Sequence, residues 1–286
     1  MKNKGTMKKT GKLWSVIMFI VILLGAFIMI YPLAWMVASS FKPELMIFKD
    51  KSLIIRQFTV EHYIRGWRGV GGTTFAKYLF NTLTIVIPVV FGTLLSSSMV
   101  GFAMARLQFR FKSLVYVLIF LTMMLPMHST LIPRYIMFKN FGWINTYLPL
   151  TVPSFFAVQG FFCYLFIQFM RGIPAELDKA ATIDGCGPIT IFIRIISPLS
   201  VPAYLTAALF SFIWTYDDFF SQLVYISNPT SFTISLALRQ YIEALELSAF
   251  GVLFAMSSLA LIPVFILFIS FQKYLVEGIA TTGMKG

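Results

Sequence analysis

Residues 13–40 read LWSVIMFIVILLGAFIMIYPLAWMVASS, a stretch without a charged side chain. A helix that crosses the hydrocarbon core of a bilayer needs about 20 such residues, so this segment is long enough to span a membrane. Just before it stand the lysines Lys2, Lys4, Lys8, Lys9 and Lys12. Their charge indicates a cytoplasmic N-terminus. The apolar part of a signal peptide is only about 7–15 residues long, so we expect the segment to be retained.

The composition of the whole chain also indicates a membrane protein. Of its 286 residues 58% are hydrophobic and 12% are charged, whereas soluble domains carry about 25% charged residues. A mean hydropathy of +0.82 corresponds to more apolar surface than one soluble core could enclose. The aromatic content of 17% excludes disorder, and the only cysteines, Cys163 and Cys186, exclude a disulfide framework or metal cluster. The basic charge stops at the first apolar segment, which argues against nucleic acid as a partner.

Further apolar runs predict an all-α integral membrane protein with six transmembrane helices. Each run is too long for a barrel strand of about 9–11 residues and lacks the alternation of such strands. Connecting segments on the side of the N-terminus carry more Lys and Arg, so we predict that both termini are cytoplasmic. The predicted spans are 13–40, 78–105, 113–133, 147–169, 199–227 and 250–272, forming a membrane domain over 13–272 with cytoplasmic tails at 1–12 and 273–286.

The longest polar interruption on the predicted cytoplasmic side is residues 170–198. Pro174 can stand in the first turn of a helix that Gly185 and Gly187 end, and Pro188 can open a second helix. The second helix has an apolar stripe of Ile189, Phe192, Ile193 and Ile196. This pattern predicts a short helix, a glycine turn and an amphipathic helix whose stripe rests on the membrane bundle. Such a unit can dock a partner or serve only as an interfacial connection.

Part of this interruption resembles a known motif. Residues 180–186 read AATIDGC, with Pro198 and Pro202 following, and this pattern resembles the EAA loop of ABC-importer permeases. Further similarity is found at residues 31–43, 131–146 and 272–286. The chain is similar to the smaller, second membrane subunit of maltose-type carbohydrate importers. That resemblance implies an ABC importer type I permease fold, a multi-pass place in a bacterial cell membrane, and transport of a sugar or oligosaccharide.

The same resemblance implies a set of partners. A second permease subunit would complete the path through the lipid membrane, and two ATPase subunits would hold ATP and Mg²⁺. An extracellular solute-binding protein would deliver the sugar to outer loops at residues 41–77 and 228–249. The chain itself has no phosphate-binding loop of the G-x-x-x-x-G-K-S/T type. We therefore expect it to be no enzyme, with no catalytic residue, metal or cofactor of its own.

In this family the EAA loop seats in a cleft of the ATPase and transmits nucleotide-driven closure to the membrane helices. One departure is that Lys179 stands where the motif has Glu. Glu176 lies three residues earlier on the same helical face, whereas Asp178 points about 100° away, so we predict that Glu176 takes over the salt bridge to the ATPase. The implied coupling residues are Glu176, Lys179, Ala180, Ala181, Asp184 and Gly185, and the implied tail contacts are Gly283 and Lys285.

Polar and aromatic side chains in the spans are candidates for the translocation path. Sugars are bound by hydrogen bonds and by stacking on aromatic rings. The candidates are Asn81, Gln159, Trp214, Tyr216, Asp217, Asp218 and Gln222. The same residues could instead form an interfacial aromatic belt and hydrogen bonds between helices.

Two other functions compete with this interpretation. A secondary transporter would use Asp217 and Asp218 for ion coupling, although six spans without a visible repeat disfavour it. An intramembrane hydrolase would need both carboxylates on one water, but adjacent residues of a helix point about 100° apart.

Overall fold

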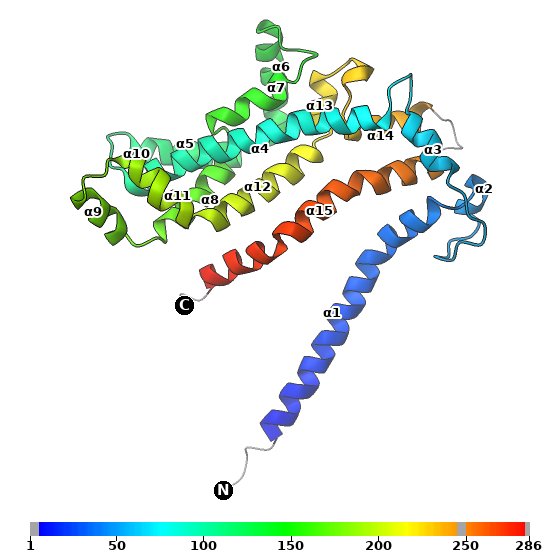
Figure 1. Cartoon of the computed structure of the whole chain (residues 1–286), viewed down its shortest axis with the longest axis horizontal. Coiled ribbons are helices and arrows are strands. Elements are labelled where there is room, and N and C mark those ends of the chain that lie inside the picture. Colours follow the sequence, from blue (N-terminus) through cyan, green and yellow to red (C-terminus); the bar gives the residue numbers. More distant parts are fainter. Residues whose placement is uncertain (1–5, 245–249, 284–286) are drawn as a thin grey trace. The chain divides into compact units, whose positions relative to one another are not determined.

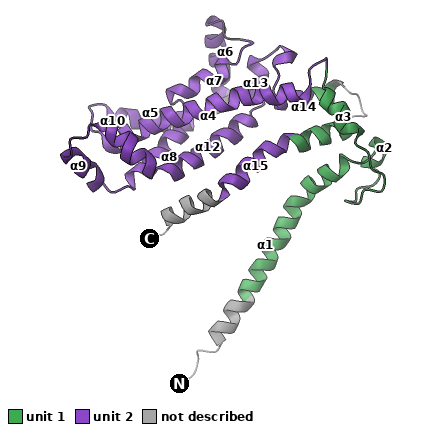
Figure 2. Cartoon of the chain, viewed as in Figure 1, with its two compact units in different colours: residues 1–70, 240–259 green, residues 71–239, 260–286 purple. Residues whose placement is uncertain are grey.

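In the computed structural model, residues 6–244 and 250–283 are described, and they form helices and connections without a strand (Figure 1). Side chains are described over residues 14–126, 129–243 and 250–272. The chain divides into two compact units, residues 1–70 with 240–259 and residues 71–239 with 260–286 (Figure 2). The predicted all-α class is confirmed, which agrees with the need to satisfy every backbone polar group inside a membrane.

The first unit is dominated by a long apolar helix. Its elements are α1 (Thr6–Ser39), α2 (Glu44–Ile47), α3 (Glu61–Arg68), the last part of α14 (Ile234–Ala244) and the first part of α15 (Phe250–Gly283). The α1 side chains from residue 14 to 33 are all exposed within the unit, and nearly all are apolar. A helix with this surface is stable in hydrocarbon and not in water.

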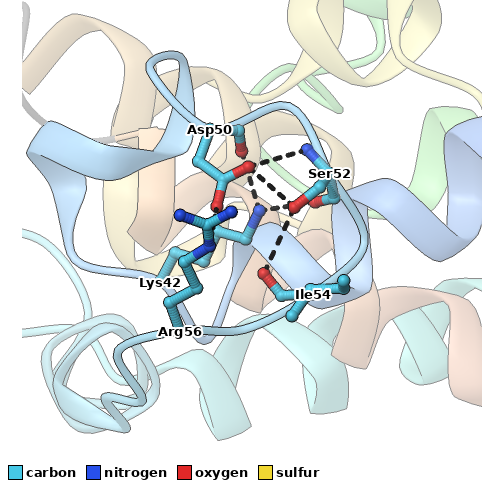
Figure 3. A network of polar contacts seen from close by, with 5 residues as sticks. All are labelled: Lys42, Asp50, Ser52, Ile54 and Arg56. Carbon is cyan, nitrogen blue, oxygen red and sulfur yellow. Dashed lines mark hydrogen bonds and ion pairs between the residues drawn. The ribbon is translucent and has the colours of Figure 1, made fainter.

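The loop after α1 is held by a buried lysine (Figure 3). Lys42 is only 2% exposed, and its Nζ donates hydrogen bonds to the carbonyls of Asp50 at 2.8 Å and Ser52 at 2.5 Å. The Asp50 carboxylate accepts from Ser52 Oγ at 2.7 Å and lies 3.7 Å from Arg56 Nε. The hydrogen bonds from Ser52 lower the pKa of the Asp50 carboxyl below its usual value. The sequence between α1 and α3 thus forms an ordered loop, because a buried ammonium is stable only when its donors are paired.

Glu44, in the same loop region, holds the start of α15. The Glu44 carboxylate accepts hydrogen bonds from the backbone N–H groups of Phe250 at 2.8 Å and Gly251 at 3.0 Å. These are the first two residues of α15, where unpaired N–H groups and the helix dipole favour a negative charge. The first unit is therefore built from sequence segments about 200 residues apart, a pairing that local patterns do not reveal.

The second unit contains the remaining elements. Its helices are α4 (Phe75–Arg106), α5 (Lys112–Met124), α6 (Leu131–Asn140), α7 (Leu148–Thr151), α8 (Gly160–Arg171), α9 (Glu176–Ile183), α10 (Pro188–Ile191), α11 (Ser197–Leu199), α12 (Val201–Tyr216), α13 (Phe220–Tyr225), the first part of α14 and the last part of α15. Single 3₁₀ turns are η1 (Met127–Thr130), η2 (Val152–Phe156) and η4 (Pro229–Ser231), and η3 (Phe192–Ile196) is a π-helical turn.

Helix α4 is the centre of this unit, and glycines set how closely its neighbours approach. A Cβ at Gly101 would overlap the Cβ of Phe166 in α8 and come within 3.2 Å of its carbonyl carbon. A Cβ at Gly92 would come within 2.7 Å of the Ser154 hydroxyl and Phe155 ring of η2. Small residues allow this approach between membrane helices, whose association depends on close packing.

Within the described residues, four helices or helix series are long and apolar enough to cross a membrane, at Trp14–Ser39, Phe75–Arg106, Leu148–Arg171 and Phe250–Gln272. A fifth is obtained if Pro188–Leu199 and Val201–Tyr216, bent by 76°, count as one span. The predicted third span, 113–133, contains the shorter helix α5 followed by η1. At 13 residues α5 is about 20 Å long, less than a core of about 30 Å. Pro126 interrupts the helix there, and the set of six spans stays a prediction.

Two other predicted spans are also interrupted. The fourth is divided by η2 and by Ala157, whose φ of 52° ends the helical path before α8 restarts at Gly160. The fifth, predicted over 199–227, ends as α12 at Tyr216 and continues after a break as α13. Asp217 and Asp218 lie in this break, so the prediction that they share one helix is wrong. The Asp218 Oδ1 accepts a 3.0 Å hydrogen bond from the Ser221 N–H, and this stabilises the start of α13.

Candidate functional site

The predicted glycine turn is present between α9 and α10, and we call residues 176–188 the elbow. Gly185 has φ of 81°, the left-handed region that glycine adopts without strain. Its N–H donates to the Thr182 carbonyl at 3.0 Å, and the Cys186 N–H donates to the Ala181 carbonyl at 2.9 Å. These two bonds form a Schellman motif, which ends the helix and satisfies its last carbonyls. The prediction that Gly185 stops this helix is confirmed.

The elbow presents one face outward and buries the other. Ala181 is buried in a core cluster with Phe166 and Phe102, so its contribution is to packing within the subunit. The other candidate coupling residues are exposed: Glu176, Lys179, Ala180, Asp184 and Gly185. Ile183 is 86% exposed beside them. An apolar side chain at such exposure within a charged turn is available to a partner protein.

The apolar stripe after the elbow is only half covered. Ile196 is fully buried and Phe192 is partly buried against the core cluster of α4 and α8. Ile189 and Ile193 are 75% and 59% exposed, so the prediction that the whole stripe rests on the bundle is wrong for these two residues. The π-helical turn at 192–196 changes the angular spacing that places the four side chains on one face in an α-helix.

An ion pair ties the elbow to α4. Arg106 Nε lies 3.1 Å from Asp178 Oδ2, and Arg106 Nη2 donates a 2.7 Å hydrogen bond to the Ile173 carbonyl. Asp178 therefore faces inward, while Glu176 and Lys179 face outward, as the predicted helical angles indicate. The sequence did not indicate Arg106, because its partner is 72 positions away in the chain and no local pattern links them.

The predicted contacts of the C-terminal tail with the ATPases involve Gly283 and Lys285. Gly283 is the last residue of α15. Lys285 lies outside the described residues, and the predicted tail contact with the ATPases stays a prediction.

A cavity of about 810 Å³ lies in the second unit. It is lined by residues of α4, α5, η1, α6, α7, α8, α12 and α13 and of the connections before α8 and α13. Among the predicted path residues it brings together Gln159, Trp214, Asp217, Asp218 and Gln222. Arg134, which the sequence did not single out, adds a positive charge to the wall. The cavity wall therefore combines hydrogen-bond donors and hydrogen-bond acceptors with the large aromatic ring of Trp214.

The rigidity of this wall comes from packed rings and buried hydrogen bonds. Trp214 packs against Phe161 and Phe162 with ring centroids 5.0 and 5.3 Å apart. Gln222 is 1% exposed, accepts a hydrogen bond from the Thr233 hydroxyl through Oε1, and donates through Nε2 to the Thr215 carbonyl at 3.3 Å. These contacts fix the orientation of the Trp214 ring, whereas the Gln222 amide is hydrogen-bonded within the wall through both its oxygen and its nitrogen.

Asn81 and Tyr216, two further candidates for the path, make hydrogen bonds within the subunit, and their role in the path stays a prediction. Asn81 is 2% exposed, and its Nδ2 donates to the carbonyls of Thr230 at 2.9 Å and Phe232 at 2.8 Å. The Tyr216 hydroxyl donates to the Ala260 carbonyl at 2.7 Å. In both cases the polar group joins distant segments of the second unit, which corresponds to the alternative of hydrogen bonds between helices.

Asn81→Leu should lower the stability of the protein by about 2–3 kcal/mol, because two hydrogen bonds of about 1 kcal/mol each are lost and their carbonyls stay buried. The measurement is the unfolding temperature of the detergent-solubilised protein. Asn81→Asp, of nearly the same shape, should be at least as unstable since a carboxylate cannot donate. Thr84→Val is the control, because Thr84 is exposed and its hydroxyl donates to the Phe80 carbonyl one turn earlier in the same helix. Normal stability with lost uptake would instead make Asn81 a path residue.

The described residues contain no group of three or more His, Cys, Asp or Glu side chains that could hold a metal ion.

Comparison with known proteins places these features in a family. Residues 97–281 match the binding-protein-dependent transport system inner membrane components. The probable ABC transporter permease protein YurM of Bacillus subtilis is 31% identical over 257 residues, covering 90% of this chain and 84% of the relative. The arabinooligosaccharides transport system permease protein AraQ of Halalkalibacterium halodurans is 31% identical over 282 residues, covering 98% and 99%.

The fold also matches a solved structure. A crystal structure of a bacterial ABC transporter involved in the import of the acidic polysaccharide alginate gives a TM-score of 0.82 at 18% identity, covering 96% of this chain and 99% of that chain. This likeness concerns the fold alone. The family match includes the whole elbow and most of the cavity wall, and the resemblance noted in the sequence is confirmed. The chain belongs to the family of binding-protein-dependent transport system inner membrane components, the permeases of ABC importers.

Proposed function

We propose that this permease carries a sugar or oligosaccharide inward across the cell membrane and couples that movement to ATP hydrolysis on a separate ATPase. The observation that carries the proposal is the elbow: a glycine turn with an exposed outer face, attached through its inner face to the unit that contains the cavity. A transporter that works alone has no need for such an exposed docking turn.

The cavity supports a sugar as substrate. The carboxylates of Asp217 and Asp218 can accept hydrogen bonds from hydroxyl groups, and the amide of Gln159 can both donate and accept. The indole of Trp214 is 46% exposed and can stack on the apolar face of a sugar ring. The relative AraQ is named for arabinooligosaccharides, which agrees with this chemistry.

The proposal includes the arrangement of the complex. Six membrane segments with both termini in the cytoplasm would place the elbow beside the ATPases. A second permease would complete the translocation path, two ATPase subunits would bind ATP and Mg²⁺, and a solute-binding protein would dock on the outer loops. The ordered loop at Lys42 and Asp50 supports that last role, since it offers a preformed surface.

The exposed charges of the elbow fit a protein partner. Glu176 and Lys179 both point outward from α9, and Asp178, paired with Arg106, does not compete for the partner. We infer that Glu176 forms the salt bridge that the motif Glu forms elsewhere, and that Ile183 packs in the same cleft. The pairing needs Lys179 to face an acidic or neutral surface of the ATPase.

The proposal is tested by purifying the tagged permease from its native membranes in mild detergent. An importer subunit should bring down an ATPase, and proteoliposomes of the complex should take up labelled oligosaccharide only with the solute-binding protein outside and ATP inside. Uptake driven by an ion gradient without any associated ATPase would refute the proposal and favour a secondary transporter.

A further inference from the structure

Arg106 and Asp178 join two helices that are distant in the sequence. Arg106 is the last residue of α4, and Asp178 lies in the first turn of α9. Besides the 3.1 Å ion pair, Arg106 donates to the Ile173 carbonyl, so its guanidinium contacts both α9 and the chain leading into it. The two side chains are 10% and 20% exposed. The pair is thus largely shielded from water and from salt.

The pair is the polar half of a two-part attachment. The apolar half consists of Ile173 and Ala181, which are buried with Phe102 of α4 and Phe166 of α8. Apolar contacts are not directional and would allow α9 to pivot. Arg106 adds direction to this attachment, because its Nη2 donates a hydrogen bond to the Ile173 carbonyl while its Nε lies within ion-pair distance of Asp178 Oδ2. Together the two halves hold α9 in one orientation on the end of α4.

Helix α4 leads from this attachment to the cavity. Val89, which lines the cavity, is about 25 Å along the helix from Arg106. Between them Gly92 and Gly101 bring η2 and α8 into contact with α4 so closely that a single Cβ would overlap them. Close-packed interfaces of this kind transmit displacement rather than absorb it. A movement of α9 can therefore reach the cavity wall through α4.

We propose that Arg106 is a positioning residue that, through Asp178 and Ile173, makes α9 and α4 move as one body. Displacement of the elbow by the ATPase is then passed to the wall of the cavity. This inference rests on the proposed function, since it needs an ATPase that moves the elbow. Glu176 and Lys179 hold the partner, and Arg106 holds the elbow to the path.

The test follows the cavity wall directly and needs no knowledge of the substrate. A single cysteine replaces Val158, which lines the cavity just after η2 and is 41% exposed, while Cys163 and Cys186 are replaced by alanine. The rate of maleimide labelling of this chain is measured by mass spectrometry in the complete complex. Nucleotide-free complex is compared with complex trapped with ATP and vanadate.

Trapping should change the labelling rate at least about fivefold in the unaltered complex, within the usual range of coupling between sites. Arg106→Gln and Asp178→Asn should reduce that change to less than about twofold while ATP hydrolysis continues. The exchanged pair, Arg106→Asp with Asp178→Arg, should restore it. Arg110→Gln is the matched control, because Arg110 is exposed, lies four residues further on and places its guanidinium over the neighbouring Phe111 ring.

The remaining outcomes would overturn either the role of the Arg106–Asp178 pair or the proposed function. Single variants that respond to trapping as the unaltered complex does would overturn the role of the pair, and so would an exchanged pair that assembles without restoring the response. If Arg106→Gln does not assemble, Arg106→Lys keeps the charge without the planar fork, and a full response in that variant would also overturn it. An unaltered permease that brings down no ATPase would refute the proposed function, and the role of Arg106 with it.

Discussion

Replacing Gly101 by leucine should prevent the second unit from folding. The new side chain would begin at a Cβ that overlaps the Cβ of Phe166 and approaches its backbone, and neither atom can rotate away. Overpacking a well-packed core usually costs about 1–3 kcal/mol, and we expect about 3 kcal/mol or more here because the obstacle includes backbone. Helix propensity alone predicts the opposite, a gain of about 1 kcal/mol on replacing glycine.

Gly25 provides the matched control for this prediction. It lies within α1, and a Cβ built there meets nothing within 4 Å. Gly25→Leu should therefore leave the yield and unfolding temperature of the protein unchanged or raise them slightly. The measurement is monodisperse protein recovered from membranes, with its unfolding temperature, for both variants. Equal recovery of the two would contradict the packing that we assign to α4 and α8.

The contrast between these glycines shows where sequence patterns stop being informative. Both stand in apolar helices, and the residues beside them do not distinguish an exposed position from a close helix contact. The apolar runs themselves predicted the class of fold, because span length and the absence of charge follow from the thickness of the bilayer. Helix breaks were harder to predict. Pro126 ends α5 early, whereas Pro32, Pro88 and Pro263 lie within continuous helices.

In the candidate site, too, local features could be predicted from the sequence and long-range contacts could not. The turn at Gly185 was predictable because a glycine after a short helix, followed by Pro188, is a local signal. The hydrogen bonds of Asn81 to Thr230 and Phe232 link positions 149 and 151 residues apart, and only the three-dimensional structure reveals them. Polar residues in membrane helices thus have similar local patterns whether they line a path or join helices.

The Arg106–Asp178 pair is the clearest case of a missed residue. Asp178 was predicted to point away from Glu176, which correctly separated an inward from an outward charge. The inward partner could not be identified, since several arginines flank the predicted cytoplasmic segments and no spacing rule selects among them. Charged residues at the ends of long helices next to a docking loop are therefore worth testing for such attachments in related permeases.

Gly185→Val should uncouple the permease from its ATPase while leaving the membrane part folded. Gly185 has φ of 81°, where a side chain costs about 1–2 kcal/mol, and a β-branched residue costs more. A Cβ there meets nothing within 4 Å, so the strain is confined to the backbone of the turn. Relief of that strain breaks the Schellman bonds of Thr182 and Ala181 and changes the path into α10. A penalty of about 1–2 kcal/mol corresponds to about 5- to 30-fold weaker binding of the ATPase, and the β-branch of valine increases it.

Gly187→Val separates this backbone effect from added bulk. Gly187 is two residues away, also has open space around it, and has φ of −77° and ψ of 166°, an extended conformation that valine favours. Copurification of the ATPase and ATP-dependent uptake should be lost in Gly185→Val and retained in Gly187→Val, with equal unfolding temperatures. If both variants lose the ATPase equally, the partner surface excludes any side chain in this loop, and the left-handed turn is not what positions the elbow. Because the two sites add the same atoms in the same loop and both have open space around them, a difference between the variants points to the left-handed backbone conformation of residue 185.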